Sequence, residues 1–243
     1  GKSVQWGSDR LGMNDCACGN EACMVCRIFS AGDCAFNEGD IRIEKDDLVI
    51  AADAGLRHCR MLGINPDLYL GDFDSVTEEE KAVIDEIAKK DPEKVVILPS
   101  VKDDTDTRAA VREGKKRGYR KFVIYGGLGG RLDHTLANLQ CIHGISVDGG
   151  FACIVDKGVR VDVLTEGRVL NLSKTEQGTI SVFAMGDRAE LVTIEGLKYE
   201  MRNGVILNTF PIGVSNEFVG KPATIQVEKG QLLVIRYLAG EDT

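Results

Sequence analysis

Hydrophobic runs of strand length alternate with helical patterns in the N-terminal half of the chain. The apolar runs span residues 24–30, 48–52, 68–70, 95–98 and 122–125. Stretches with helical character lie between or after the later runs, at residues 56–62, 77–90, 107–117 and 133–143. Strands that alternate with helices are typical of parallel sheets that helices cover. We therefore expect an α/β domain with a mostly parallel sheet and helices on both faces.

Cap and stop signals set the expected helix boundaries. Ser75 and Glu78 have the spacing of a capping box, which places a helix start near residue 77. Gly63, Gly118 and Gly144 directly follow helical patterns. Because glycine often ends a helix, we expect the preceding helices to stop there.

The pattern changes after about Gly149 to short alternating segments, and helical periodicity disappears. Typical segments are VRVDVL, TISVFAM, AELVTIEGL, TIQVEKG and QLLVIRYL. Such strands, separated by Gly, Asp and Asn, indicate an antiparallel β-sandwich or small barrel, and we favour the sandwich. We expect a leader at residues 1–23, an α/β domain at 24–156 and the β-sandwich domain at 157–243.

Composition and charge exclude several classes of partner. The chain has 243 residues, 43% of them hydrophobic, and a net charge of −8. No block rich in lysine or arginine suggests binding to nucleic acid or to an anionic membrane, so an anionic ligand would need a metal or a local arginine. No apolar run approaches the ~18 residues of a membrane span, and the start lacks a signal-peptide pattern, so we expect a cytoplasmic protein.

The cysteines are a weak metal signal. Four of the eight cysteines lie close together as C-x-C-x4-C-x2-C, at Cys16, Cys18, Cys23 and Cys26. The C-x-C half is poor spacing for a zinc ribbon, and no histidine lies nearby. We therefore favour free thiols in the leader over a metal site.

Acidic residues follow successive predicted strands. Asp53 follows LVIAA, GDFDS follows LYL, KDDTD follows VVILPSV, and Arg131 with Asp133 follows FVIYGGLGG. Ligands of open α/β sheets bind at the carboxyl ends of the strands. Asp and Ser in such places also serve as turn formers or helix caps, as Ser75 and Thr105 would, but capping does not require doubled aspartates.

The doubled aspartates favour a bound cation. In an extended segment Asp72 and Asp74 would face the same side, and Phe73 would turn into the core. Asp103 and Asp106, three residues apart at a helix start, can share one face. Because neighbouring carboxylates repel and Mg²⁺ prefers oxygen ligands, these residues predict a magnesium site.

The segment GGLGGRLDH, residues 126–134, supplies groups for an anion. It matches neither the P-loop nor the dinucleotide fingerprint. Its glycines would let backbone N–H groups approach phosphate, and Arg131 adds a cationic fork. His134 is more typical of a packed or capping residue than of a catalytic acid or base.

Five segments in order, AADAG, NPDLYLGDFDS, KDDTD, GGLGGRLDHTLAN and GVSNEF, closely resemble the thiamine pyrophosphokinase family. The resemblance runs from about Arg27 to Tyr237 and leaves out the leader. It implies Mg²⁺-dependent transfer of pyrophosphate from ATP to thiamine, which gives thiamine diphosphate and AMP. It also implies an N-terminal catalytic domain, a C-terminal β-sandwich, and a homodimer with active sites in clefts between the subunits.

The resemblance also implies roles for single residues. Those of the metal and triphosphate site would be Asp72, Asp74, Asp103 and Asp106. Nucleotide contacts would be Asp53, Thr105, Gly127, Gly129, Gly130, Arg131 and Asp133, and thiamine contacts Asp133, Ser215 and Asn216. We expect catalysis to depend on Asp72, Asp74, Asp106 and Arg131, with Asp74 and Asp106 as the two candidates for a general base.

Two departures and two rival functions qualify the resemblance. Ala54 stands where the family usually has a second glycine, and the only tryptophan, Trp6, lies in the leader. DFDS also resembles the nucleophile motif of haloacid-dehalogenase phosphatases, which belongs on the first strand, whereas two apolar strands precede it here. A nucleotide sensor without catalysis would need only the binding edge.

Overall fold

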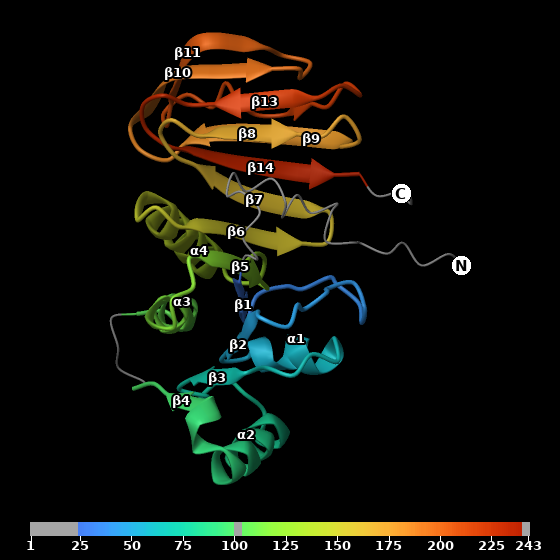
Figure 1. Ribbon diagram of the computed structural model, residues 1–243, viewed down its shortest axis with the longest axis vertical. Helices are drawn as coiled ribbons and strands as arrows, with labels where there is room; N and C mark the ends of the chain where they lie inside the picture. The colour runs from blue at the N-terminus through green and yellow to red at the C-terminus, as the bar shows by residue number, and fades with distance from the viewer. Residues whose placement is uncertain (1–23, 100–103, 240–243) are drawn as a thin grey trace, which may run out of the picture. The chain divides into compact units, whose positions relative to one another are not determined.

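The computed structural model describes residues 24–99 and 104–239, which form two compact units. Unit 1 holds the described residues up to Cys141 together with Gly150–Lys157. Unit 2 holds Ile142–Gly149 and the described residues from Gly158 onward. Figure 1 shows helices and strands alternating in unit 1 and strands predominating in unit 2.

Unit 1 is built on a parallel sheet. Its strands are β1 (Val25–Phe29), β2 (Leu48–Ala52), β3 (Leu68–Gly71), β4 (Val95–Ile97), β5 (Lys121–Tyr125) and β6 (Phe151–Asp156). They lie in the order β6-β5-β1-β2-β3-β4, and each neighbouring pair is parallel. The central strands are buried along their whole length, as their unbroken apolar runs predict. The predicted parallel sheet is confirmed.

Helices cover both faces of this sheet. The helices are α1 (Gly55–Met61), α2 (Glu78–Lys90), α3 (Asp106–Lys116) and α4 (Leu132–Val147), with a 3₁₀ turn at Pro92–Lys94. Leu56 of α1 and Ile84 of α2 belong to one hydrophobic cluster with Phe29 of β1. On α3, a Cβ at Gly114 would lie 2.8 Å from both Cys26 Sγ and Phe122 Cε1. Cys26 and Phe29 point to opposite faces of β1, and Figure 1 shows α3 across the strands from α1.

The predicted capping box of α2 and the predicted end of α4 are wrong, whereas the predicted start of α2 near residue 77 is confirmed. The capping box at α2 is formed by Thr77 and Glu80 instead of Ser75 and Glu78. Thr77 has the extended backbone of an N-cap, whereas the Ser75 hydroxyl donates to Asp53. Helix α4 also continues past Gly144 to Val147, because the last turn buries Ile145, which outweighs the ~1 kcal/mol that a helical glycine costs.

Unit 2 is a β-sandwich, as predicted. Its strands are β7 (Val159–Leu164), β8 (Val169–Leu172), β9 (Gly178–Ala184), β10 (Arg188–Glu195), β11 (Met201–Leu207), β12 (Asn216–Glu217), β13 (Ala223–Gln226) and β14 (Leu232–Leu238). One antiparallel sheet has the order β12-β9-β14-β7, and the other has the order β11-β10-β13-β8. Val182 and Val234 of the first sheet join Val192 and Ile225 of the second in one core.

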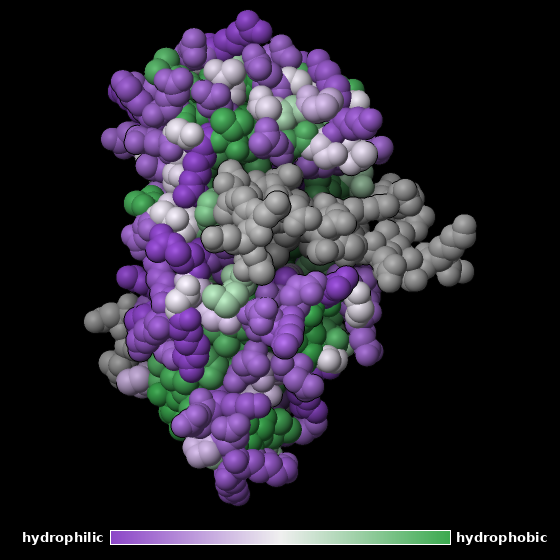
Figure 2. Space-filling view, in the orientation of Figure 1, coloured by the Kyte–Doolittle hydropathy of each residue, from purple (hydrophilic) through white to green (hydrophobic). Residues whose placement is uncertain are grey.

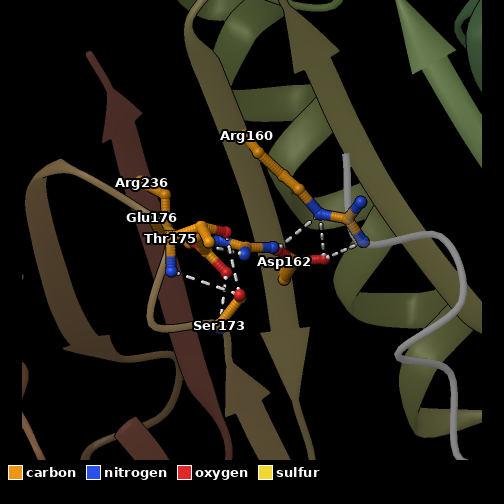
Figure 3. A network of polar contacts seen from close by, with 6 residues as sticks. All are labelled: Arg160, Asp162, Ser173, Thr175, Glu176 and Arg236. Atoms are coloured by element: carbon orange, nitrogen blue, oxygen red, sulfur yellow. Dashed lines mark hydrogen bonds and ion pairs between the residues drawn. The ribbon is translucent and has the colours of Figure 1, made fainter. Parts of the chain in front are cut away.

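A network of ion pairs shares a face with this core (Figure 3). Arg160 Nη2 and Arg236 Nη2 each lie 2.8 Å from an oxygen of Asp162, and Arg236 Nη1 lies 2.9 Å from Glu176 Oε2. Asp162 stands opposite Val234 in the strand register, so its side chain projects on the core face. Burial alone would raise the pKa of Asp162, but the two guanidinium groups hold it at about 2. The carboxylate is therefore ionised and fully paired.

Cys26 lies inside unit 1, which corrects its assignment to a leader cluster. It is buried in β1, and burial raises the pKa of its thiol to about 12. Such a thiol is inert, so Cys26 is a core residue. Cys16, Cys18 and Cys23 lie outside the described residues.

The surface in view is mostly polar, with scattered apolar patches (Figure 2). None of the helices that the structure describes is long and apolar enough to cross a lipid bilayer.

Candidate active site

The parallel sheet brings the predicted strand-end residues to one edge of unit 1. All six strands run the same way, so their carboxyl ends share an edge. Asp53 follows β2, Asp72 and Asp74 follow β3, Asp106 opens α3 after β4, and the glycine segment follows β5. Asp103, the remaining predicted metal ligand, lies outside the described residues.

Asp53 is held in a strained and incompletely paired state. Its backbone φ is 48°, which is unusual for a residue with a side chain. The Ser75 hydroxyl donates to Oδ2, whereas Oδ1 is buried with no hydrogen-bond partner among the described residues. Gly71 on β3 allows the approach, because a Cβ there would lie 3.1 Å from Asp53 Cα. A buried carboxylate oxygen without a partner is costly, so this atom is suited to a cation or an incoming donor.

The segment after β3 is not extended, which corrects the geometric argument for its two aspartates. Phe73 has a φ of 59°, so the alternation of a strand ends at Gly71. The Asp74 backbone N–H donates to Asp72 Oδ1 at 3.2 Å, which folds the segment into a tight turn. Phe73 packs against the core of unit 1, as predicted. The turn conformation therefore sets the directions of the two carboxylates.

The start of α3 adds one further carboxylate to the edge. Thr105 is the N-cap, and its hydroxyl accepts the Arg108 backbone N–H at 3.2 Å, so the predicted cap is confirmed. Asp106 lies in the first turn, where the helix dipole favours negative charge. Among the residues that the structure describes, no three His, Cys, Asp or Glu side chains lie close enough to hold a metal ion.

The glycine segment after β5 has a conformation that only glycine adopts easily. Gly126, Gly129 and Gly130 have φ values of 63°, 75° and 60°. We call residues 126–130 the glycine loop. The stretch that leaves β1 supports it, because the backbone N–H groups of Gly32 and Asp33 donate to the loop carbonyls of Gly126 and Leu128, both at 2.8 Å.

Gly127 has a different role from the other loop glycines. It is buried, and a Cβ there would lie 2.8 Å from Ile154 Cγ2. Its carbonyl accepts the Asn138 side-chain amide at 2.9 Å. These contacts fix the loop against β6 and α4, so they account for this glycine by packing.

Arg131 and Asp133 pair with each other at the end of the loop. Arg131 Nη2 lies 2.6 Å from Asp133 Oδ2, and both side chains are exposed. The hydrogen bond from Arg131 is the main cause that lowers the pKa of Asp133. The predicted cationic fork therefore already holds a carboxylate in this structure.

Asp33 also lies at the glycine loop, and the sequence analysis did not single it out. Its carboxylate lies against Gly129, where any side chain would overlap it. The segment FSAGD, in which an aspartate closely follows the first strand, carried the signal. The carboxylate therefore adds negative charge next to the glycine loop.

In unit 2, Asn216 is an anchoring residue. Its side chain is buried, its Oδ1 accepts the Tyr199 N–H at 2.9 Å, and its Nδ2 donates to the Tyr199 carbonyl at 2.7 Å. Tyr199 itself is 61% exposed. Ser215 is exposed with a φ of 59°, and its N–H donates to Ser181 Oγ at 3.0 Å. Asn216 thus fixes the backbone beneath an exposed aromatic ring.

Comparison with known protein families assigns both halves of the chain. The family model described as "Thiamin pyrophosphokinase, catalytic domain" matches residues 41–155, and "Thiamin pyrophosphokinase, vitamin B1 binding domain" matches residues 168–232. The chain belongs to the thiamine pyrophosphokinase family.

Individual relatives agree with this assignment. The thiamine pyrophosphokinase of Bacillus subtilis is 28% identical over 195 residues, which cover 79% of this chain and 88% of that protein. A crystal structure of thiamine pyrophosphokinase from the same organism matches with a TM-score of 0.77 and 27% identity, over 88% of this chain and 98% of that one. The yeast enzyme, at 15% identity and a TM-score of 0.67 over 91% of this chain and 88% of that one, shares the fold.

The two thiamine pyrophosphokinase models fall on different architectures, the α/β sheet of unit 1 and the β-sandwich of unit 2. The catalytic-domain match covers β2 to β5, the glycine loop and the strand-end aspartates that the structure describes. The B1-binding match covers the sandwich strands from β8 to β13, including Ser215 and Asn216. Asp33 precedes both matched segments.

Proposed function

We propose that this protein transfers the pyrophosphoryl group of ATP to the hydroxyl of thiamine, giving thiamine diphosphate and AMP. The observation that carries the proposal is the order of the two family matches. The catalytic model falls on the α/β unit with the carboxylate edge, and the B1-binding model falls on the sandwich. A cytoplasmic location stays part of this proposal.

The glycine loop and Arg131 would bind the triphosphate. The loop's left-handed glycines expose backbone N–H groups, which donate to phosphate oxygens. Arg131 would exchange its carboxylate partner Asp133 for phosphate, and its fork fits two oxygens. Asp53 Oδ1, which is buried without a partner, supports a donor or cation at the same edge. The Thr105 hydroxyl caps α3, so Thr105 would contact the nucleotide from the N-terminus of that helix.

The carboxylates at the edge fit Mg²⁺ by donor chemistry. Asp72, Asp74 and Asp106 offer the oxygen ligands that this ion prefers, and Asp103 would complete the set. The uncompensated oxygen of Asp53 supports positive charge nearby. An Mg²⁺ ion held by these carboxylates would supply positive charge against the negative charge that develops on the phosphate oxygens.

Thiamine would be held by Ser215, Asn216 and Asp133. Its cationic ring suits an acidic surface, whereas such a surface would repel an anionic acceptor. The Asn216 side chain has three hydrogen bonds within the protein, so its main contribution would be to fix the backbone of Tyr199 and Glu217 in place. In line attack needs the hydroxyl beside the β-phosphorus, with Asp74 and Asp106 as candidates for accepting its proton. A homodimer with active sites shared between subunits is part of the proposal.

Turnover of ATP with thiamine tests the function. Purified protein with Mg²⁺, ATP and thiamine should release AMP and thiamine diphosphate in equal amounts, measured by mass spectrometry. AMP release should stop when thiamine is omitted. Phosphate release without thiamine would instead support the phosphatase, and ATP binding without any product would support the sensor.

A further inference from the structure

His58 of α1 contacts both chain segments that form the base of the glycine loop. Its Nε2 lies 2.7 Å from the carbonyl oxygen of Gly32, which is 26 residues away in the chain. At the neighbouring ring carbon, a Cβ at Gly126 would lie only 3.2 Å from His58 Cδ2. The imidazole therefore lies where the stretch after β1 meets the stretch after β5.

The hydrogen bond determines the state of the ring. A carbonyl only accepts, so Nε2 carries a proton and donates it to the Gly32 carbonyl. Nδ1 is buried and has no hydrogen-bond partner among the described residues. A leucine would fill the same space without burying an unpaired nitrogen. Histidine at this position therefore carries the cost of an unpaired buried nitrogen. Packing alone does not explain a histidine here, whereas the hydrogen bond from Nε2 does.

The bond reaches the glycine loop through one residue, Gly32. Gly32 accepts from His58 through its carbonyl and donates its own N–H to the Gly126 carbonyl at 2.8 Å. Gly32 also has no room for a side chain, because a Cβ there would contact the carbonyl oxygens of Leu128 and Gly126. The ring, Gly32 and Gly126 are thus linked in series by two hydrogen bonds, and Gly32 is closely packed against the loop.

We infer that His58 is a positioning residue for nucleotide binding, which holds Gly32 and thereby the glycine loop in the conformation that accepts the triphosphate. The inference rests on the proposed function, since that function assigns the loop to ATP. His58 acts through Gly32 and does not touch the substrates. Its loss should therefore affect the nucleotide, and leave thiamine binding unchanged.

Three variants separate this role from a general effect on folding. His58→Leu keeps the bulk and removes the donor, whereas His58→Gln keeps an N–H at the reach of Nε2. His143→Leu is the matched control, because His143 lies on α4, and its Nε2 contacts Gln231 at 3.4 Å within unit 2. For each variant, the KM for ATP, the KM for thiamine and the melting temperature are measured.

We expect His58→Leu to raise the KM for ATP on the order of tenfold, the size of one lost hydrogen bond to a buried carbonyl. The KM for thiamine should stay within about twofold, and His58→Gln should restore most of the ATP effect. The inference is overturned if both KM values rise together, if His58→Gln behaves like His58→Leu, or if His58→Leu matches the wild type. A wild-type protein that makes no thiamine diphosphate would instead refute the proposed function. In that case, calorimetry measures the affinity of the wild type and of His58→Leu for ATP, and this comparison tests the role of His58 without turnover.

Discussion

Arg131 and Asp133 form a two-pronged ion pair on the surface of unit 1, with Nη2 to Oδ2 at 2.6 Å and Nε to Oδ1 at 3.1 Å. The carboxylate thereby occupies the side of the guanidinium that fits two phosphate oxygens. Under the proposed function, an arriving triphosphate would have to displace Asp133 from it. The pair would then link Arg131, proposed for the nucleotide, to a residue proposed for thiamine.

The first prediction concerns Arg131. Arg131→Lys keeps the charge but loses the fork, so kcat should fall on the order of tenfold, and Arg131→Ala should be worse. Steady-state kinetics at saturating Mg²⁺ measures this. Arg188→Lys, at an exposed arginine 3.6 Å from Glu190, is the control and should be silent. A wild-type kcat for Arg131→Lys would show that Arg131 takes no part in turnover.

The second prediction concerns the metal. Asp72→Asn and Asp74→Asn should each lose most of the activity, because each removes a charged oxygen ligand. The circular dichroism spectra should stay unchanged. Asp85→Asn, at an exposed position of α2, should retain full activity. EDTA should abolish turnover, and full activity in EDTA would contradict metal dependence.

The third prediction concerns Asn216. Asn216→Ala leaves the Tyr199 N–H and carbonyl unpaired, so the thiamine pocket should loosen while the ATP site stays intact. We expect the KM for thiamine to rise on the order of tenfold and the KM for ATP to change less than about twofold. Equal rises in both values would argue against a role in the acceptor pocket.

The fourth prediction concerns the ion network of unit 2. Asp162→Asn leaves two buried arginines without their shared countercharge. Breaking a buried pair in this way typically costs about 3–5 kcal/mol, and we expect such a loss of unfolding free energy. Urea denaturation measures it. Glu190→Gln, at a half-buried carboxylate with long contacts to Arg188 and Lys229, should cost less than about 1 kcal/mol. If Asp162→Asn also lowered the free energy of unfolding by less than about 1 kcal/mol, the network would contribute little to stability.

The fifth prediction is the acid sensitivity that this carboxylate confers. Its pKa is about 2 in the folded protein, below the ordinary value of 3.8. A depressed pKa stabilises the folded state above the ordinary value, and that contribution disappears as the pH falls towards 2. The stability difference between wild type and Asp162→Asn should therefore be constant above about pH 5 and shrink from pH 4 to pH 2. A constant difference down to pH 2 would contradict this.

The sequence by itself determined the α/β unit and which of its residues meet at one edge. Unbroken apolar runs require strands that are buried on both faces, and such strands are parallel with helices between them. Once the strands are parallel, every residue directly after a strand lies at the same edge. Asp53 and Asp72 could therefore be assigned to that edge before any coordinates were known.

Only the tertiary structure decided how those residues are held. The left-handed turn at Phe73 and the single bond from Ser75 to Asp53 depend on how neighbouring strand ends meet. The bond from His58 to Gly32 joins residues 26 apart, and the pair of Arg236 with Asp162 joins residues 74 apart. Periodicity reports only local preference, because it records the side of an element on which each residue lies. Contacts between distant segments form when the chain closes on itself, so only the folded structure specifies them.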